Sequence, residues 1–291
     1  MRYLKEVQQG IVPPTWWTFE DCGHNDEAQK ETAGLIGQKV FSTPKPLRLI
    51  QRMLTVGADA DSVVMDFFAG SGATGHAVLA QNNVDGGNRR YVLIQLPEPL
   101  DSGNADQKAA VDFCTQLGKP HTVAEITKER LRRAGNNIRE ENPMFAGDIG
   151  FRVFKLDSSN IRAWEPAPDD LDGTLFDSVE HIKPGRTESD ILYELLLKLG
   201  LDLCVPIDTR DIAGKPVHSV GGGVLMACLA TSIAREEAEP LALGMAAWRR
   251  ELAPAGETAC VFRDSAFADD VAKSNLAAIL SQHGLTNVRS L

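Results

Sequence analysis

A glycine-containing turn between an apolar strand and a helix is the feature that most constrains the fold of this chain. Residues 63–67 form an apolar run with an acid, Asp66, near its end, and Phe68-Ala69-Gly70-Ser71-Gly72 follows. A helical pattern begins directly after the second glycine. Glycine adopts positive φ and lets a ligand approach the backbone, and the first N–H groups of a helix are free to bind one. The pattern predicts a strand, a cofactor-binding turn and a helix.

The sequence after the turn predicts a βαβ unit. We expect the helix to run to about Gln81, and residues 85–88 (Asp-Gly-Gly-Asn) are a turn sequence. Residues 91–96 are almost continuously apolar, which is typical of a strand that is covered on both faces of a parallel sheet. Residues 62–96 are therefore expected to form the strand, helix and strand of an α/β fold.

The flanking segments predict further helices. Thr43 is expected to cap a helix that has Pro44 at its first position, and residues 1–40 are expected to be an irregular connection. Residues 122–125 (Thr-Val-Ala-Glu) have the pattern of a capping box at the start of a helix that reaches about Arg139. The arginines at 130–133 indicate a solvated face of that helix rather than a DNA contact.

Residues 151–291 predict a second, smaller α/β domain. Residues 151–156 alternate like a half-buried strand, and a capping sequence at 187–190 starts a leucine-rich helix that stops at Gly200. Gly221–Gly223 indicate a hairpin turn rather than a phosphate loop, because no Lys-Ser/Thr follows them. The remaining expected elements are strands at 217–220, 224–229, 258–262 and 287–290 and helices near 235–252 and 268–283.

Composition narrows the class of protein. The net charge of the 291 residues is −10, and both halves are acidic, so neither is expected to bind nucleic acid by itself. The five cysteines have no close pairs, which predicts a reducing, cytoplasmic environment and neither disulfides nor a metal site. No apolar run approaches the length of a membrane span, and the first residues are too polar for a signal peptide.

The motifs together resemble the cofactor half of amino-methylating DNA methyltransferases. Asp66, Phe68, Gly70 and Gly72 match the Asp-x-Phe-x-Gly-x-Gly of their motif I, and Thr43-Pro44-Lys45-Pro46 matches the Thr-x-Lys-Pro of their motif X. The chain is more similar still to the modification subunits of type III restriction–modification systems, over essentially its whole length. The segments that carry this resemblance include 67–79, 85–90, 95–100, 126–130, 154–160, 199–203 and 261–265.

The resemblance implies a partial Rossmann-like lobe that binds S-adenosylmethionine. It implies that the backbone of the turn approaches the methionine part of the cofactor. Asp66 would pair with the ammonium group, and Thr43 and Lys45 would meet the carboxylate. Phe68 would cover the apolar surface of the cofactor. Gln95 would meet the ribose, with the carboxylate of Glu98 as the alternative. The full set of expected cofactor-binding residues is Asp66, Phe68, Ala69, Gly70, Ser71, Gly72, Thr74, Thr43, Lys45, Pro46 and Gln95.

It also implies an activity, a domain order and partners. The family reaction is methylation of adenine N6 in DNA. Residues 1–40 would end the target-recognition region, 41–145 would form the cofactor lobe and 151–291 the C-terminal domain. The implied partners are DNA through the full enzyme, a helicase–nuclease restriction subunit and a second modification subunit.

The base-holding motif of that family, Asp-Pro-Pro-Tyr, does not occur in these residues, so no catalytic residue is predicted. Met1 is expected to be an internal methionine of a longer ancestor or the start of a split or truncated gene. The chain alone is expected to bind the cofactor weakly or not at all and to methylate nothing. One alternative is a non-catalytic fragment that docks modification and restriction subunits. Another is a nicotinamide-dependent oxidoreductase, since glycines 70, 72 and 75 fit Gly-x-Gly-x-x-Gly, although Asp66 and Gln95 tell against it.

Overall fold

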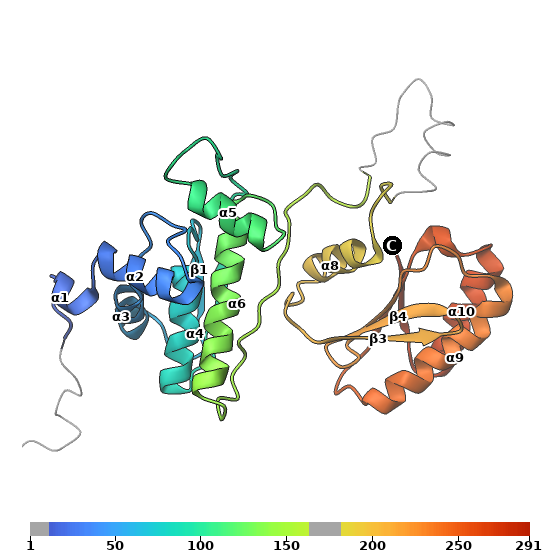
Figure 1. Ribbon diagram of the computed structural model, residues 1–291. Helices are drawn as coiled ribbons and strands as arrows, with labels where there is room; N and C mark the ends of the chain where they lie inside the picture. Colours follow the sequence, from blue (N-terminus) through green and yellow to red (C-terminus); the bar gives the residue numbers. More distant parts are fainter. Residues whose placement is uncertain (1–11, 163–181) are drawn as a thin grey trace, which may run out of the picture. The chain divides into compact units, whose positions relative to one another are not determined.

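The computed structural model describes residues 12–162 and 182–291, which belong to two compact units, Met1–Phe151 and Arg152–Leu291 (Figure 1). Each unit combines helices with a β-sheet, as the sequence predicts for an α/β chain. No helix within the described ranges is long and apolar enough to cross a membrane.

The first unit contains the predicted βαβ arrangement. Strand β1 (Val63–Asp66) pairs in parallel with β2 (Arg90–Leu93), with Val63 opposite Arg90, and α4 (Ala73–Asp85) connects them. Both strands are shorter than the apolar runs suggest. Two backbone hydrogen bonds extend the pairing past the strand ends, from Ile94 N–H to Asp66 O and from Ala69 N–H to Ile94 O.

The two-stranded sheet is covered on one face. Val64 and Tyr91 point into a cluster that includes Ile50 of α3 (Leu47–Gly57) and Val78 of α4. On the opposite face the exposed fractions of four apolar side chains are 52% for Val63, 52% for Met65, 41% for Val92 and 44% for Ile94. Among the described residues, the prediction that the second strand is covered on both faces is therefore wrong.

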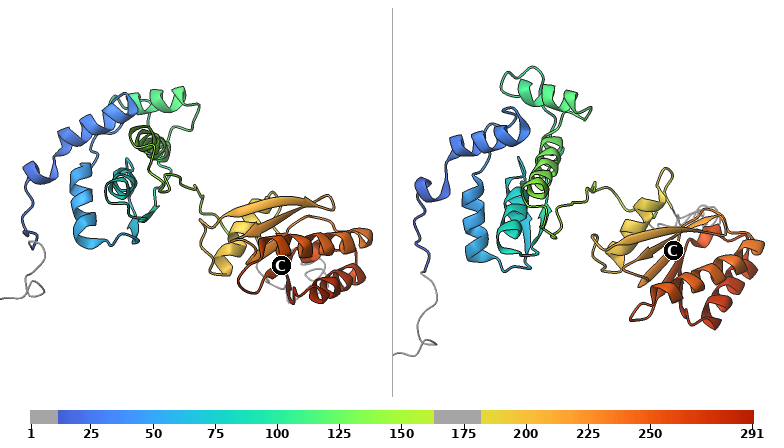
Figure 2. Two further views of the ribbon diagram at one scale, coloured as in Figure 1. Left: turned by 90° about the horizontal axis from the view of Figure 1, so that it is seen from below. Right: turned by 60° about the horizontal axis from the view of Figure 1, so that its bottom comes forward.

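Helices frame the sheet on its covered side. α6 (Val123–Glu141) lies beside α4 and also contacts α2 (Asn25–Ile36), as Figures 1 and 2 show. Two shorter helices are α1 (Phe19–Cys22) and α5 (Lys108–Gln116). The prediction that residues 1–40 are irregular is wrong, because α1 and α2 lie there. The buried face of α2 consists of Ala28, Thr32 and Ile36, which is too small and mixed to give an apolar pattern.

Two predicted helix starts are corrected. α3 begins at Leu47, after Pro46, and Thr43 does not cap it. The cause is Pro46, which disfavours helical backbone at the preceding Lys45. At α6, Thr122 is the N-cap residue but its side chain makes no capping hydrogen bond. The carboxylate of Glu125, the other half of the predicted capping box, forms an ion pair with Lys128 instead.

The second unit is a five-stranded sheet in the order β3-β4-β5-β6-β7. The first three strands are antiparallel and the last three are parallel. Helices α9 and α10 cover one face and α8 covers the other (Figure 2). The elements are α8 (Glu188–Lys198), β3 (Ile207–Ile212), β4 (Lys215–Val220), β5 (Leu225–Cys228), α9 (Arg235–Leu252), β6 (Ala259–Phe262), a 3-10 turn (Asp264–Ala266), α10 (Asp270–Gln282) and β7 (Asn287–Ser290).

Most predicted elements of this unit are confirmed. The triple glycine joins β4 to β5, and Thr187 and Asp190 form the capping box of α8. The strand β3 was not predicted, because only its two end residues are apolar. The predicted strand at 151–156 is wrong: the segment has no partner strand among the described residues, and the side chain of Leu156 is fully exposed.

Candidate cofactor-binding site

The turn between β1 and α4 has both glycines in the left-handed region, with φ of +52° at Gly70 and +78° at Gly72. The N–H of Gly72 donates to the carbonyl of Ala69 over 2.7 Å and closes the turn. A Cβ at Gly72 would lie 3.1 Å from Cγ2 of Thr127, so α6 packs directly against the turn. The positive φ expected from the sequence is confirmed, and a second reason for glycine, close packing, is added.

Asp66 closes the end of β1 onto the turn. Its Oδ1 accepts the N–H of Phe68 at 3.0 Å, and its Oδ2 accepts the hydroxyl of Thr74 at 2.5 Å. These bonds give Asp66 the structural role of a strand-end cap. A carboxylate has about four acceptor positions, so Asp66 keeps acceptor capacity for a cationic ligand.

Gln95 ties the end of β2 to the same turn. Its Oε1 accepts the N–H of Gly70 at 2.8 Å, and its Nε2 donates to the carbonyl of Leu96 at 3.2 Å. The bond to Gly70 was not predicted, because the two residues are 25 positions apart. One N–H of the Gln95 amide remains to donate to a ligand hydroxyl.

The residues upstream of α3 begin beside the turn. A Cβ at Gly70 would lie 3.4 Å from Cζ of Phe41, so the chain at Phe41 contacts the turn. Further along, Thr43 and Lys45 are exposed and Pro46 is buried. Within the described residues, Lys45 takes part in no hydrogen bond or ion pair, and its ammonium group is free to meet an anion.

Phe68 is the most exposed aromatic side chain of the turn, at 86%. Ser71 has the opposite environment: it is buried, and its hydroxyl accepts a hydrogen bond from Nη1 of Arg130 over 2.8 Å. Phe68 can therefore cover an apolar ligand surface, whereas the side chain of Ser71 is turned to α6.

Arg130 is a residue of this region that sequence reasoning misjudged. Its exposed fraction is 0%, so the prediction of a solvated face at this position is wrong. The signal was present in the spacing, because Ile126, Arg130, Ala134 and Ile138 recur every four residues and share the buried face of α6. The presence of an arginine in this apolar stripe could have identified Arg130 as a buried residue.

Burial shifts the pKa of Arg130 and of its neighbour His76. Nε of Arg130 lies 3.5 Å from Nδ1 of His76. Burial, helped by the charge of Arg130, lowers the pKa of His76 to about 3. Burial lowers the pKa of Arg130 to about 10. At neutral pH the imidazole is neutral and the guanidinium is charged, which suits a hydrogen bond from Arg130 to His76.

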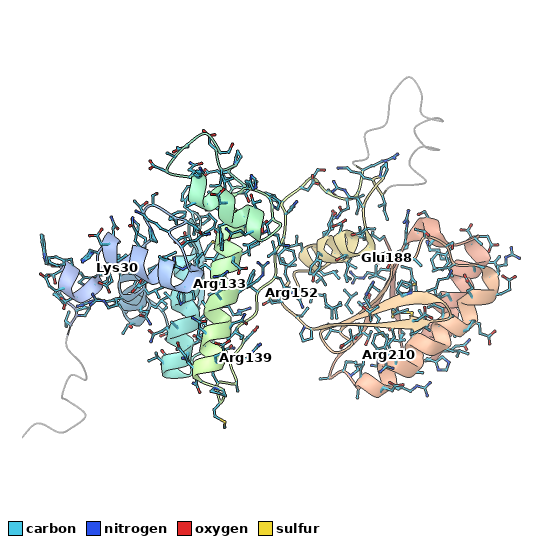
Figure 3. The ribbon with its side chains drawn as sticks, in the orientation of Figure 1. Lys30, Arg133, Arg139, Arg152, Glu188 and Arg210 are labelled. Carbon is cyan, nitrogen blue, oxygen red and sulfur yellow. The ribbon has the colours of Figure 1, made fainter. Side chains whose placement is uncertain are left out.

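The two arginines that follow on α6 join elements of this unit. Arg133 donates to the carbonyls of Ile36 at 2.6 Å and Leu35 at 3.4 Å, at the end of α2 (Figure 3). Arg132 pairs with Glu129 and lies over the ring of Phe151. Arg133 is thus a structural link between helices, which corrects the solvated-face interpretation at this position.

A groove of about 390 Å³ lies between α2, α4 and α6, lined by residues that include Glu31, Leu35, His76 and Asn137. None of the expected cofactor-binding residues lines it. The candidate site therefore lies at the turn, the end of β2 and the segment before α3, where Phe68, Thr43 and Lys45 are exposed.

Comparisons with known proteins agree with these motifs. Residues 1–96 match a family described as DNA methylase. The chain is 37% identical over 143 residues to the type III restriction-modification enzyme StyLTI Mod subunit of Salmonella typhimurium, a match that covers 49% of this chain and 21% of that protein. It is 31% identical over 195 residues to the EcoPI Mod subunit of Escherichia phage P1, covering 67% of this chain and 28% of that protein.

A third relative is the type II methyltransferase M.KpnI of Klebsiella pneumoniae, which is 32% identical over 124 residues, or 43% of this chain and 27% of that protein. The matches thus cover between about a fifth and a little over a quarter of the length of these curated relatives. On these matches, residues 1–96 are similar to the DNA methylase family, and the chain is similar to the modification subunits of type III restriction–modification enzymes.

Proposed function

We propose that this chain supplies the S-adenosylmethionine-binding part of a type III modification enzyme, a DNA methyltransferase that acts on adenine N6. The observation that carries the proposal is the joining of Asp66, the glycine turn and Gln95 at the carboxyl ends of two parallel strands. Ligands of open parallel α/β sheets bind at this edge. We assign residues 41–145 to a Rossmann-like cofactor lobe, residues 1–40 to the end of a target-recognition region and residues 151–291 to a C-terminal domain.

The residues at this edge fit a zwitterionic, partly apolar cofactor. Asp66 has acceptor positions left for the ammonium group, and the exposed Lys45 and Thr43 offer donors for the carboxylate. Phe68 is exposed to cover the apolar part. Gln95 is assigned to the ribose. The remaining assigned positions contribute through their backbone, their packing or the geometry of the turn: Pro46, Ala69, Gly70, Ser71, Gly72 and Thr74.

S-adenosylmethionine supplies an electrophilic methyl group, so the protein's task is to bind it and to orient it toward the target amine. The residues named above perform the binding and the orientation. The target base must be held by groups outside these residues, because the Asp-Pro-Pro-Tyr motif does not occur among them. We therefore propose that methylation requires a methyltransferase polypeptide that carries that motif.

The bare face of the two-stranded sheet favours such a partner. Parallel sheets are normally covered on both faces, yet Val63, Met65 and Val92 are half exposed here, and within the described residues no strand pairs with the outer edge of β1. The same face also supports the second candidate function, a non-catalytic fragment that assembles modification and restriction subunits. DNA, a restriction subunit and a second modification subunit are the partners that both versions propose, following the names of the relatives.

Titration calorimetry with S-adenosylmethionine tests the cofactor role. The chain is measured alone and together with a type III methyltransferase segment that carries Asp-Pro-Pro-Tyr. We expect weak binding alone and tighter binding with the segment. Asp66→Asn should weaken binding by at least about tenfold, the value of one charged hydrogen bond. Asp61→Asn, an exposed acid before the other end of β1, is the matched control and should bind like the wild type.

Absence of binding in both settings would refute the cofactor role and favour the assembly fragment. Met65→Asp places a charge on the bare sheet face and away from the turn. This substitution should abolish the increase in S-adenosylmethionine affinity that the methyltransferase segment produces. It should leave the weak binding by the chain alone unchanged. A gain that survives Met65→Asp would contradict docking at this face.

A further inference from the structure

The glycine turn is held from behind by α6, through two side chains that no motif assigns to the cofactor. The hydroxyl of Thr127 donates to the carbonyl of Gly70 at 2.5 Å, and Nη1 of Arg130 donates to the hydroxyl of Ser71 at 2.8 Å. Thr127 and Arg130 are one helical turn apart and so face the turn together. We call these two residues the α6 brace.

The brace leaves the turn little freedom. The N–H of Gly70 is bound by Gln95 and its carbonyl by Thr127, so both backbone polar groups of this glycine are fixed by side chains from other elements. At Gly72 a Cβ would lie 3.1 Å from Cγ2 and 3.4 Å from the carbonyl oxygen of Thr127. The turn is therefore both bonded to and packed against one residue of α6.

The burial of Arg130 indicates that its bond to Ser71 matters. A buried guanidinium loses its hydration, and its cost is recovered only through good hydrogen bonds. Within the described part of the chain, Nη2 of Arg130 makes no hydrogen bond. Nη1 and Nε donate to neutral groups, the hydroxyl of Ser71 and the imidazole of His76. An apolar side chain would fill the same stripe of α6 without that cost, so packing alone does not account for an arginine here.

We propose that Thr127 and Arg130 are positioning residues, which hold the glycine turn in the conformation that receives the cofactor. The proposal rests on the proposed function for its consequence, tighter cofactor binding. Its structural part concerns the turn in the free chain and can be measured without the cofactor. By fixing the carbonyl of Gly70 and the side chain of Ser71 toward α6, the brace leaves the opposite side of the turn for the ligand.

Amide hydrogen exchange in the full chain, followed by NMR, tests the brace directly. The N–H groups of Gly70 and Gly72 both donate hydrogen bonds within the turn, so their exchange reports its opening. Thr127→Val keeps the shape and removes the hydroxyl, whereas Thr127→Ser keeps the hydroxyl. We expect exchange at both glycines to quicken by about five- to tenfold in Thr127→Val, as for loss of one hydrogen bond, and to stay near the wild-type rate in Thr127→Ser.

Arg130→Met is the corresponding change at the second residue, and Arg133→Met is its matched control. Both arginines lie on α6, but Arg133 bonds to the end of α2 and not to the turn. Arg130→Met should quicken exchange at Gly70 and Gly72, and Arg133→Met should not. If Arg130→Met does not fold, the Thr127→Val and Thr127→Ser pair decides the question. Unchanged exchange in Thr127→Val would overturn the proposal.

Calorimetry with S-adenosylmethionine, with the methyltransferase segment present, gives the second measurement. Thr127→Val should lose about five- to tenfold in affinity and Thr127→Ser should retain it. Fast exchange combined with wild-type affinity would overturn the positioning role. If the wild-type chain binds no cofactor in any setting, the proposed function fails, while the exchange result still decides whether the brace orders the turn.

Discussion

The side-chain oxygen Oε1 of Gln95 accepts a hydrogen bond from the backbone N–H of Gly70 over 2.8 Å. This bond joins the end of β2 to the turn that follows β1. Where related dinucleotide-binding folds place an acid for the ribose, this chain has an amide that supports the turn. In the proposed cofactor site, Gln95 would therefore act in part indirectly, through the shape of the turn.

Replacing Gln95 by alanine should weaken S-adenosylmethionine binding by about five- to tenfold, because the N–H of Gly70 loses its partner. Gln95→Glu keeps an acceptor at the same place and should bind within about twofold of the wild type. Titration calorimetry measures both. Equal losses of affinity in the two variants would show that cofactor binding depends on the amide N–H of Gln95 rather than on its bond to Gly70.

Gly75 sets the spacing between α4 and its neighbours. A Cβ there would lie 2.7 Å from Cδ2 of Leu131 and 3.0 Å from Cδ1 of Leu93. Gly75→Ala should therefore lower the free energy of unfolding of the first unit by about 1–3 kcal/mol, as overpacking does. Gly34→Ala in α2, where nothing lies within 4 Å, should be neutral or raise it by about 0.5–1 kcal/mol. Urea unfolding followed by NMR signals of first-unit residues measures both.

His76 predicts a pH dependence of stability. Its pKa is about 3 in the folded chain, because burial and Arg130 oppose its protonation, and about 6.5 in the unfolded chain. Between these values the unfolded chain binds more protons, so acid favours unfolding. The contribution is complete above pH 6.5 and is lost as the pH falls toward 3, by up to about 1.4 kcal/mol per pH unit.

His76→Gln keeps an acceptor for Arg130 but does not titrate, so it should flatten the fall in unfolding free energy between pH 6.5 and about 4. His283→Gln, at the exposed end of α10, should retain the wild-type slope. Urea unfolding at a series of pH values gives the slopes. Parallel slopes for wild type and His76→Gln would show that His76 is not held neutral.

The capping box of α8 predicts the stability of the second unit. The hydroxyl of Thr187 accepts the N–H of Asp190 at 3.2 Å, and the carboxylate of Asp190 accepts the N–H of Thr187 at 2.8 Å. Thr187→Ala should cost about 1 kcal/mol. Ser189→Ala, an exposed residue of the same turn, should change the free energy of unfolding by less than about 0.5 kcal/mol. Hydrogen exchange of the α8 amides reports the difference.

Local sequence was sufficient wherever neighbours along the chain make the decisive contacts. The glycine turn, the capping box of α8 and the hairpin at Gly221–Gly223 each depend on residues within a few positions of one another. The predicted strand at 151–156 failed for the opposite reason, because alternation cannot supply a partner strand. Residues 25–36 gave no helical signal, because their buried face is built from Ala28, Thr32 and Ile36 and is recognisable only against α6.

The sequence by itself determined the βαβ order, the positive φ of Gly70 and Gly72 and the resemblance to DNA methylases. Only the tertiary structure decided that Arg130 is buried, that Ser71 points to α6 and that Gln95 bonds to Gly70. These outcomes depend on hydrogen bonds between residues far apart in the sequence: Arg130 and Ser71 are 59 positions apart, and Gln95 and Gly70 are 25 positions apart. The identity of a distant partner is set by how helices and strands pack, because a polar side chain leaves water only where that packing brings it a hydrogen bond.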